Sequence, residues 1–467
     1  MMSGSMRLLA AVIAAAAVLS AAPSCSSKKS SGKSQPAASD TDAAETTAAD
    51  GNGSLSAEEL EIIWLADYDL NPAENSKRST ALAIFEDIYG GRINYVQTSP
   101  DGKFSALDSM LASGENVDMF PCDLGVFPDG VMRDRFAPLD PYFGDMGVND
   151  GLWADTEQLS DALAYKGQHY IMPYSVSDPQ VLTYSRKLMK SEGIDDPRKL
   201  WQEGKWDWDA MKSMIDKFKK NQPNAARYGI NGSYGQAALA STGHTVVSFD
   251  GSSLKNNLAD ADIGKAVGLI CDIRNNGWYS SILRDTFPSD FNTLFFASGS
   301  WTLGISNAAN PEGDLMIVPF PKSPDADKCY ISCNINSRML VKGSDKGRTV
   351  AAYLRCERLA ATEEKFVKAA REEATAEKKN ASGSFRSFIT DEQYDALQEY
   401  LDPTKVTPVF DCGWGMGDTM SGNGNYTTDS RGVMQRITET GPYGRSYEQL
   451  RDELSPVIDS EIAKYNS

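Results

Sequence analysis

Histidine is scarce in this chain, which has His169 and His244 and no others among 467 residues. A three-histidine metal site and an HExxH motif are therefore excluded. No CxxC pair occurs either, so a structural zinc site is not expected. The sequence predicts neither a metal nor a cofactor.

Positive charge is also in deficit. The 46 Lys and Arg residues face 64 Asp and Glu residues, and the formal net charge is −18. The sequence lacks the basic stripes and polybasic helices with which proteins bind nucleic acid or anionic lipid surfaces. We expect no nucleic-acid partner and no electrostatic attachment to a membrane.

Long apolar runs are limited to Leu8–Ala22, which Arg7 precedes. The run is shorter than the roughly 20 residues of a membrane-spanning helix, but it suits the apolar core of an export signal. Small residues and then Cys25 follow. This pattern resembles the bacterial lipobox, which implies a signal peptide over residues 1–24 and a lipid on Cys25 as the sole membrane anchor. An ordinary secretory peptide cleaved near Ala22 is the alternative, and both place the protein outside the cytoplasmic membrane.

Residues 25–57 have little to bury. After Cys25 the segment is rich in Ser, Ala, Lys, Thr and Asp, and it contains no aromatic residue. Such a composition cannot offset the entropy of ordering the chain. We predict a disordered tether.

Strand and helix patterns alternate in the next segment. Short apolar runs predict strands over 61–65, 93–96 and 117–120, and apolar residues at helical spacing predict helices over 76–89 and 103–112. This alternation is typical of a parallel sheet with helices on its faces, an α/β fold.

A series of segments resembles the extracellular solute-binding proteins of ABC importers, in the cluster that includes maltose-binding protein. Each motif is short, but they occur in the family's order over about residues 58–355. They are FEDIYG at 85–90, LASGENVDM at 111–119, YKGQHYIMPY at 165–174, YSRKL at 184–188, WDWD at 206–209, FFASGSW at 295–301, IVPFP at 317–321 and the stretch 336–342.

The resemblance implies two α/β lobes that face each other across a cleft. Each lobe is a mainly parallel sheet flanked by helices, and the chain crosses between the lobes more than once. We expect the first lobe to hold residues 58–172 and 318–375, and the second to hold 173–317 and 376–467. Ligands of such sheets bind at the carboxyl ends of strands.

The resemblance also implies a function. A lipid-anchored monomer would capture a small solute, most simply a mono- or oligosaccharide, by hinge closure and deliver it to an ABC permease without altering it. A cell-surface glycan-binding adhesin or scaffold is one alternative. An extracellular glycoside hydrolase with two carboxylates is another, although no GxSxG motif or histidine-based triad is recognisable.

Acidic and aromatic residues after the predicted first-lobe strands are candidate ligand contacts. Asp67, Tyr68 and Asp69 follow the first strand, and Asp123 follows the third. Carboxylates accept strong hydrogen bonds from hydroxyl groups, and aromatic rings pack on the apolar faces of sugars. Solvated turns are the alternative interpretation of these positions.

Further candidates lie at the first lobe crossing and in the second lobe. Tyr174 and Ser175 follow Pro173, where hinge packing is the alternative, and Tyr234 lies in a Gly-flanked segment. Trp301 follows Ser298-Gly299-Ser300, and Trp414 lies in a long polar stretch rich in glycine, either a mobile part of the site or a surface loop.

Six cysteines remain after Cys25: Cys122, Cys271, Cys329, Cys333, Cys356 and Cys412. An even number in an exported protein permits disulfides, with no connectivity fixed by the sequence. Cys329 and Cys333 are four residues apart in an extended stretch, roughly 13 Å, so we do not expect them to bond each other.

Overall fold

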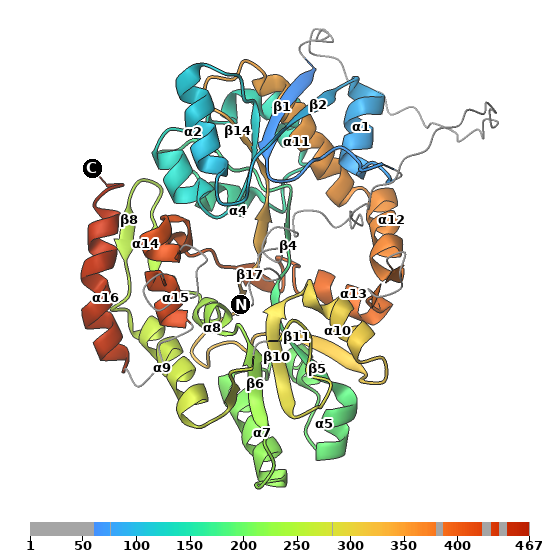
Figure 1. The fold of residues 1–467 in the computed structure, drawn as a ribbon, viewed down its shortest axis with the longest axis vertical. Helices are drawn as coiled ribbons and strands as arrows, with labels where there is room; N and C mark the ends of the chain where they lie inside the picture. Colours follow the sequence, from blue (N-terminus) through green and yellow to red (C-terminus); the bar gives the residue numbers. More distant parts are fainter. Residues whose placement is uncertain are drawn as a thin grey trace, which may run out of the picture.

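The computed structural model describes residues 60–466, apart from 75, 283, 380–385, 423–430 and 439–445. Cys25, the predicted signal peptide and the predicted tether lie outside the described residues. The described chain forms two α/β lobes, which stand one above the other in Figure 1.

The first lobe is built on a four-stranded sheet in the order β14-β3-β1-β2. Two of its three strand contacts, β1 with β2 and β1 with β3, are parallel, as the sequence predicted. Trp64 of β1 is fully buried in the core of this lobe. The strands are β1 (Glu61–Ala66), β2 (Arg92–Gln97), β3 (Met119–Pro121) and β14 (Arg338–Leu340), and the main helices are α1 (Thr80–Tyr89), α2 (Lys103–Ser113), α3 (Phe143–Met146), α4 (Glu157–Ala162) and α11 (Gly347–Thr362).

Local capping explains where α1 begins and ends. The Ser79 side chain accepts a hydrogen bond from the backbone N–H of Leu82, so the helix begins at Thr80 and not at the predicted 76. Gly90 ends it in the left-handed conformation, with φ of 72°. The predicted end at Tyr89 is confirmed.

The second lobe is built on a five-stranded sheet in the order β11-β5-β10-β6-β9. A capped helix begins at Trp208, where the Asp207 side chain accepts a hydrogen bond from the backbone N–H of Ala210. The strands are β5 (Gln180–Ser185), β6 (Tyr228–Gly232), β9 (Tyr279–Ser280), β10 (Thr293–Gly299) and β11 (Leu315–Pro319). The helices include α5 (Arg186–Glu192), α6 (Pro197–Gln202), α7 (Trp208–Asn221), α8 (Gly235–Ala240), α9 (Ala261–Asn275), α10 (Thr302–Ala309), α13 (Asp391–Glu399), α14 (Asp418–Ser421), α15 (Val433–Thr438) and α16 (Tyr447–Ile462).

Two crossings between the lobes pair with each other. β4 (Ser175–Ser177) and β13 (Asn334–Asn336) form an antiparallel ribbon, which we call the hinge ribbon. β5 follows β4 into the second sheet, and β14 follows β13 into the first. Both strands run antiparallel to their sheet neighbours, because each enters its sheet from the other lobe. The first residues of β5 and β14 therefore lie at the edge where the parallel strands end.

The return to the first lobe occurs later than predicted. Residues 315–319 form β11, which pairs with β5 in the second sheet, so the expected boundary at 318 falls inside a strand. The apolar IVPF run is buried in the second lobe, and the crossing follows at β13.

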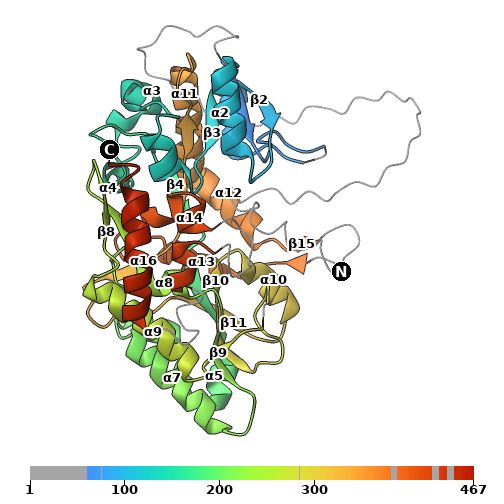
Figure 2. The same ribbon diagram turned by 60° about the vertical axis from the view of Figure 1, so that its left-hand side comes forward.

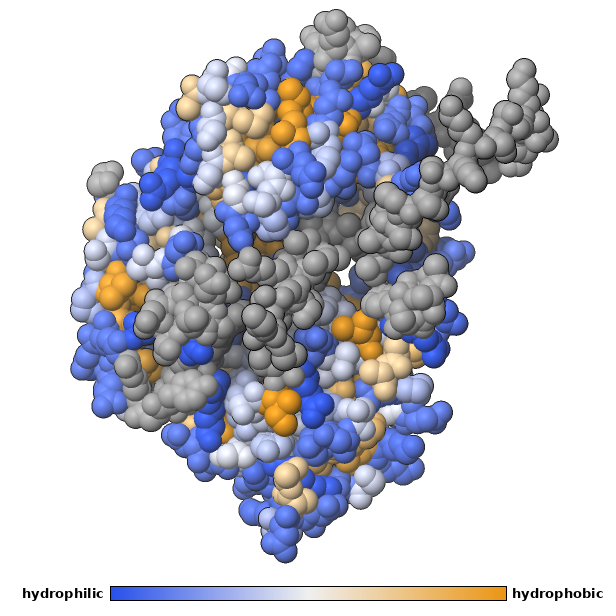
Figure 3. Space-filling view, viewed as in Figure 1, coloured by the Kyte–Doolittle hydropathy of each residue, from blue (hydrophilic) through white to orange (hydrophobic). Residues whose placement is uncertain are grey.

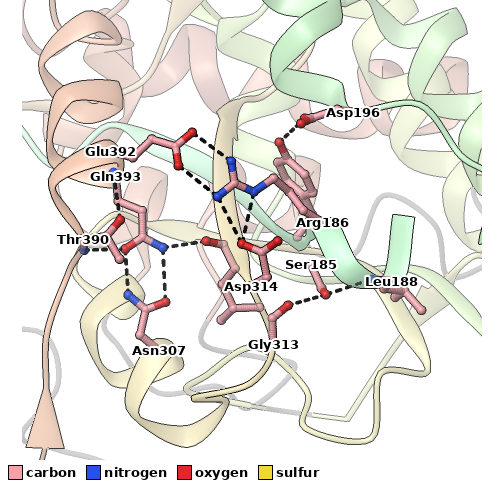
Figure 4. A network of polar contacts seen from close by, with 12 residues as sticks. Ser185, Arg186, Leu188, Asp196, Asn307, Gly313, Asp314, Thr390, Glu392 and Gln393 are labelled. Atoms are coloured by element: carbon pink, nitrogen blue, oxygen red, sulfur yellow. Dashed lines mark hydrogen bonds and ion pairs between the residues drawn. The ribbon is translucent and has the colours of Figure 1, made fainter. Parts of the chain in front are cut away.

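α12 (Glu364–Thr375) makes a third connection, and α13 is anchored in the second lobe. Figure 4 shows this anchor, in which the Gln393 amide bonds both to Asn307 of α10 and to the backbone oxygen of Leu315. Arg186 adds an ion pair with Glu392, with Nη1 2.8 Å from Oε1.

The lobes also touch beside α16 (Figure 2), which stands apart from β4 of the hinge ribbon in the view of Figure 1. The Tyr465 hydroxyl donates to Asp129 Oδ1 at 2.8 Å. The rings of Phe127 and Phe249 meet edge to face, with their centroids 4.9 Å apart. These contacts join the segment after β3 to the second lobe.

The visible face of both lobes is largely hydrophilic (Figure 3), in keeping with the acidic composition. Among the described residues, no helix combines the length and the apolar character needed to cross a membrane. The six cysteines that the structure describes are free thiols, so the disulfides that the sequence permitted do not form among them.

Gly232 allows the closest backbone approach in the second sheet. Its φ is +87°, and a Cβ there would lie 2.1 Å from the backbone oxygen of Ala297. Gly204 also has a positive φ, +71°, but a Cβ there would meet nothing within 4 Å. We expect Gly204→Ala to lower the free energy of unfolding by about 1 kcal/mol, and Gly232→Ala to cost about 1–3 kcal/mol more because backbone must move. Urea denaturation of both variants measures the difference, and equal losses would contradict the prediction.

Candidate functional site

Three predicted residues meet at the carboxyl edge of the first sheet. Asp67 and Tyr68 follow β1, and Asp123 follows β3, the neighbouring strand. Lys103, the first residue of α2, pairs with both carboxylates, with its Nζ 3.7 Å from Asp67 Oδ1 and in direct contact with Asp123. One ammonium therefore holds two carboxylates from separate strand ends.

Arg338 lies at the same edge, because it is the first residue of the entering strand β14 and stands opposite Pro121 in register. Its side chain is 4% exposed. Nη2 is 2.7 Å from Glu357 Oε1 on α11, and Nη1 donates to the Tyr68 hydroxyl at 3.2 Å. We call Asp67, Tyr68, Lys103, Asp123, Arg338 and Glu357 the first-lobe cluster.

Aromatic rings surround the Arg338 guanidinium. Its central carbon lies 5.3 Å from the ring centroid of Trp64 and 5.5 Å from that of Tyr174. Burial lowers the pKa of Arg338, but Tyr174, Tyr68 and Glu357 raise it above its ordinary value, so the group stays charged. Burial raises the pKa of Tyr68 to about 12, which keeps the phenol protonated at neutral pH.

Tyr174 and Ser175 connect this cluster to the hinge ribbon. The backbone N–H of Tyr174 donates to the oxygen of Asn336, and the Asn336 amide donates to Ser175 Oγ at 2.9 Å. The Tyr174 side chain is buried against Arg338. Both residues take part in hinge packing, the alternative that the sequence left open.

A second polar group lies just before β5, where Asp178 stands between β4 and β5. Asp178 Oδ1 accepts from the Ser300 hydroxyl at 2.9 Å and from the backbone N–H of Trp301 at 3.1 Å. Burial raises the pKa of Asp178 against the effect of these bonds. Gly299 makes room, since a Cβ there would lie 2.5 Å from Asp178 Oδ2. Trp301 is 37% exposed, which leaves its ring free to contact a solute.

Two glutamines extend this group. Gln180 Nε2 donates to Gln236 Oε1 at 3.4 Å, and Gln236 Nε2 donates to Ser332 Oγ at 3.0 Å. The buried side-chain oxygen of Gln180 has no hydrogen-bond partner among the residues that the structure describes. We call Asp178, Gln180, Gln236, Ser300 and Trp301 the second-lobe cluster.

The two clusters stand at opposite ends of the hinge ribbon. Tyr174 and Asp178 are four positions apart in the sequence, so their backbones are at most roughly 14 Å apart. A molecule about the size of a disaccharide can reach both. Polar groups of both signs and a half-exposed indole can bind a polar, uncharged solute.

The other predicted contacts lie elsewhere. Tyr234 is 2% exposed in the second-lobe core, with its ring 5.6 Å from that of Tyr279. Trp414 packs on the same core within the short helix Cys412–Gly415. Asp69 is exposed and accepts two hydrogen bonds from Asn71, in the turn that the sequence offered as the alternative. The structure does not bring these three into either cluster.

Sequence reasoning missed Lys103, Arg338, Glu357, Asp178 and Gln180. Lys103 begins a helix and Glu357 lies within one, and neither position differs locally from a solvated residue. The useful signal was topological, because the first residues of strands that enter from the other lobe must lie at the site. Asp178 also has a φ of +49°, a conformation that a side chain seldom adopts without support from its surroundings.

Other polar groups and hollows of the second lobe share no residue with the clusters. A hollow of about 640 Å³ lies between α9 and α16, lined by residues that include Gly268 and Tyr447. His244, Asp260 and Asp262 bring possible metal-ligand atoms within 4.8 Å of one another. The Lys265 ammonium already donates to Asp262 there.

Comparisons with known proteins agree with this architecture. A family model described as a bacterial extracellular solute-binding protein matches residues 80–353. No curated protein sequence matches the chain.

Solved structures share the fold at low sequence identity. The chain is similar to the sugar-binding protein MalE from Xanthomonas citri, with 16% identity, a TM-score of 0.60, and coverage of 86% of this chain and 98% of that one. A sugar transporter from Rhizobium etli in an open conformation gives 14% identity, a TM-score of 0.61, and coverage of 86% and 99%. The galacto-N-biose/lacto-N-biose I-binding protein from Bifidobacterium longum, in complex with lacto-N-biose, gives 10% identity, a TM-score of 0.57, and coverage of 89% and 98%.

Asp411, which caps the Trp414 helix, makes the stability of the second lobe depend on pH. Its carboxylate accepts from the N–H groups of Val246, Val247 and Gly413, and burial raises its pKa from 3.8 to about 6. The folded state therefore binds this proton more tightly than the unfolded state, so the contribution is greatest below pH 4 and is lost as the pH rises through 6.

We expect the wild type to gain roughly 2–3 kcal/mol relative to Asp411→Asn between pH 6 and pH 4. Urea denaturation of both proteins across this range measures the gain. Parallel pH profiles would show that Asp411 titrates normally.

Proposed function

Because the chain belongs to the bacterial extracellular solute-binding proteins, we propose that it captures a carbohydrate between its lobes and hands it to a membrane permease of the ABC type. The protein acts outside the cytoplasm as a binding protein. Its substrate leaves unchanged, since the role requires binding and release alone.

The observation that carries this proposal is the pair of clusters at the two ends of the hinge ribbon. The first-lobe cluster offers carboxylate oxygens and a phenol, and the second offers amides and the half-exposed Trp301. Sugars present hydroxyls at their edges and C–H groups on their faces, which match these two kinds of group. Sugar-binding proteins among the similar structures support the same class of solute.

Closure of the lobes would couple binding to delivery. A solute that touches both clusters makes more contacts in the closed arrangement than in the open one. It shifts the equilibrium between the two only by the difference between its affinities for them. The hinge ribbon supplies a short connection about which the lobes can rotate. The permease would then recognise the closed form.

The first test measures binding and closure. We expect maltose, lacto-N-biose or β-1,6-galactobiose to raise the melting temperature, because a ligand at 100 times its Kd adds about 2.7 kcal/mol to the folded state. The radius of gyration from small-angle scattering is expected to fall in the same samples. Asp123→Asn should weaken the shift, since it removes a carboxylate of the first-lobe cluster.

Asp134→Asn is the matched control. It breaks an ion pair of the same kind, with Lys342, on the outer surface of the first lobe, and it should leave the shift unchanged. A thermal shift without compaction would favour a glycan-binding adhesin. No shift with any of the three sugars would overturn the carbohydrate proposal.

We further propose that Cys25 carries the lipid that attaches the protein to the membrane. In a bacterium that processes lipoproteins, the wild type is expected in the membrane fraction and labelled by radioactive palmitate. Cys25→Ser should move the protein to the soluble exported fraction without label. Retention of the variant in the membrane would refute the anchor, and Cys122→Ser serves as the control substitution.

A further inference from the structure

Arg338 is a buried charge for which the proposed function has as yet no use. Its side chain is 4% exposed, and its Nε has no hydrogen-bond partner among the described residues. A buried ion pair is seldom more stabilising than apolar residues of the same volume, because both charges must leave water. Stability alone therefore does not account for the Arg338–Glu357 pair.

The contact with Tyr68 suggests a role. A phenol hydroxyl can accept hydrogen bonds and donate one. Arg338 Nη1 donates to the Tyr68 oxygen at 3.2 Å and so occupies its acceptor side. No hydrogen bond among the described residues has the Tyr68 hydroxyl as its donor. Its hydrogen is therefore available to donate to a ligand.

The surroundings fix the guanidinium in one place. The rings of Trp64 and Tyr174 lie within 5.5 Å of its central carbon, and Glu357 holds Nη2 at 2.7 Å. A planar group held in this way can approach the Tyr68 oxygen from one direction only. The ring of Tyr68 is also fixed, because it meets Trp64 edge to face at 5.4 Å.

We propose that Arg338, held by Glu357, is a positioning residue that directs the Tyr68 hydroxyl hydrogen toward a hydroxyl oxygen of the bound sugar. The inference rests on the proposed function and deepens it, because it names the polarity of one contact. The sugar must present an acceptor to Tyr68. Arg338 acts through Tyr68 and does not itself touch the sugar.

A double-mutant cycle tests this role in the full chain. Affinity for maltose, lacto-N-biose and β-1,6-galactobiose is measured by calorimetry. We expect Tyr68→Phe to weaken binding about 10-fold, the value of one hydrogen bond. Arg338→Met combined with Glu357→Gln, which leaves no lone buried charge, should weaken it by a similar factor.

The triple variant decides between positioning and mere support. If Arg338 acts through Tyr68, its loss costs nothing further once the hydroxyl is gone, and the triple variant binds as Tyr68→Phe does. If the pair only supports the fold, the two losses multiply to about 100-fold, which overturns the inference. Equal binding by the wild type and the Arg338/Glu357 variant overturns it as well.

Two further measurements keep the outcome clear. Arg186→Met with Glu392→Gln removes the ion pair drawn in Figure 4, which is more exposed and lies at the opposite end of β5 from Asp178, and it should leave affinity unchanged. If the Arg338→Met/Glu357→Gln variant does not fold, Glu357→Gln alone is used in its place. It should weaken sugar binding less, and it should cause no further loss of affinity when it is combined with Tyr68→Phe. If the wild type binds none of the three sugars, the proposed function fails and the inference falls with it, whereas multiplying losses overturn the inference alone.

Discussion

The hinge ribbon determines how the two sheets are completed and where the residues of the two clusters lie. β4 and β13 pair over three residues each, and the strand after each crossing enters the sheet of the opposite lobe. A strand that enters from the other lobe must start where the parallel strands end, so it runs against them. For this reason Asp178 and Arg338, which are distant in sequence from the other site residues, lie at the same sheet edges as Tyr68 and Trp301.

In the first-lobe cluster, positive and negative side chains pair with one another. Two cations face three carboxylates, and each cation is shared or enclosed: Lys103 pairs with Asp67 and Asp123, and Arg338 pairs with Glu357 between two rings. The structure gives a site whose charges are largely satisfied by one another, which leaves directional hydrogen bonds to select the solute.

Much of the architecture could be predicted from the sequence because local sequence patterns determine it. The first two strand–helix units follow from apolar spacing and from Gly90, and Asp67, Tyr68 and Asp123 follow from their places after strands. The lobe boundary at 318 was misplaced because a buried strand and a crossing segment look alike in one dimension.

The partners of the site residues could not be predicted in the same way. Arg338 meets Tyr68 across 270 positions, and no local pattern encodes that contact. Tyr234 and Trp414 were chosen as aromatic residues near glycine, but here Tyr234 is buried in the core of the second lobe and Trp414 packs, partly buried, against that core. Contacts that arise only from tertiary packing could not be predicted from the sequence.

The low exposure of Lys103 and Asp67 in the first-lobe cluster affects how the protein responds to the salt concentration around it. The Lys103 side chain is 13% exposed and that of Asp67 is 6% exposed. At an ionic strength of roughly 0.1–0.15 M, salt largely screens exposed charges that lie more than about 8–10 Å apart, and it weakens sheltered pairs far less. A protein outside the cytoplasm meets a medium whose ionic strength the cell does not control. The Lys103–Asp67 pair therefore keeps more of its strength at high salt than the contact with Asp123, whose side chain is 34% exposed.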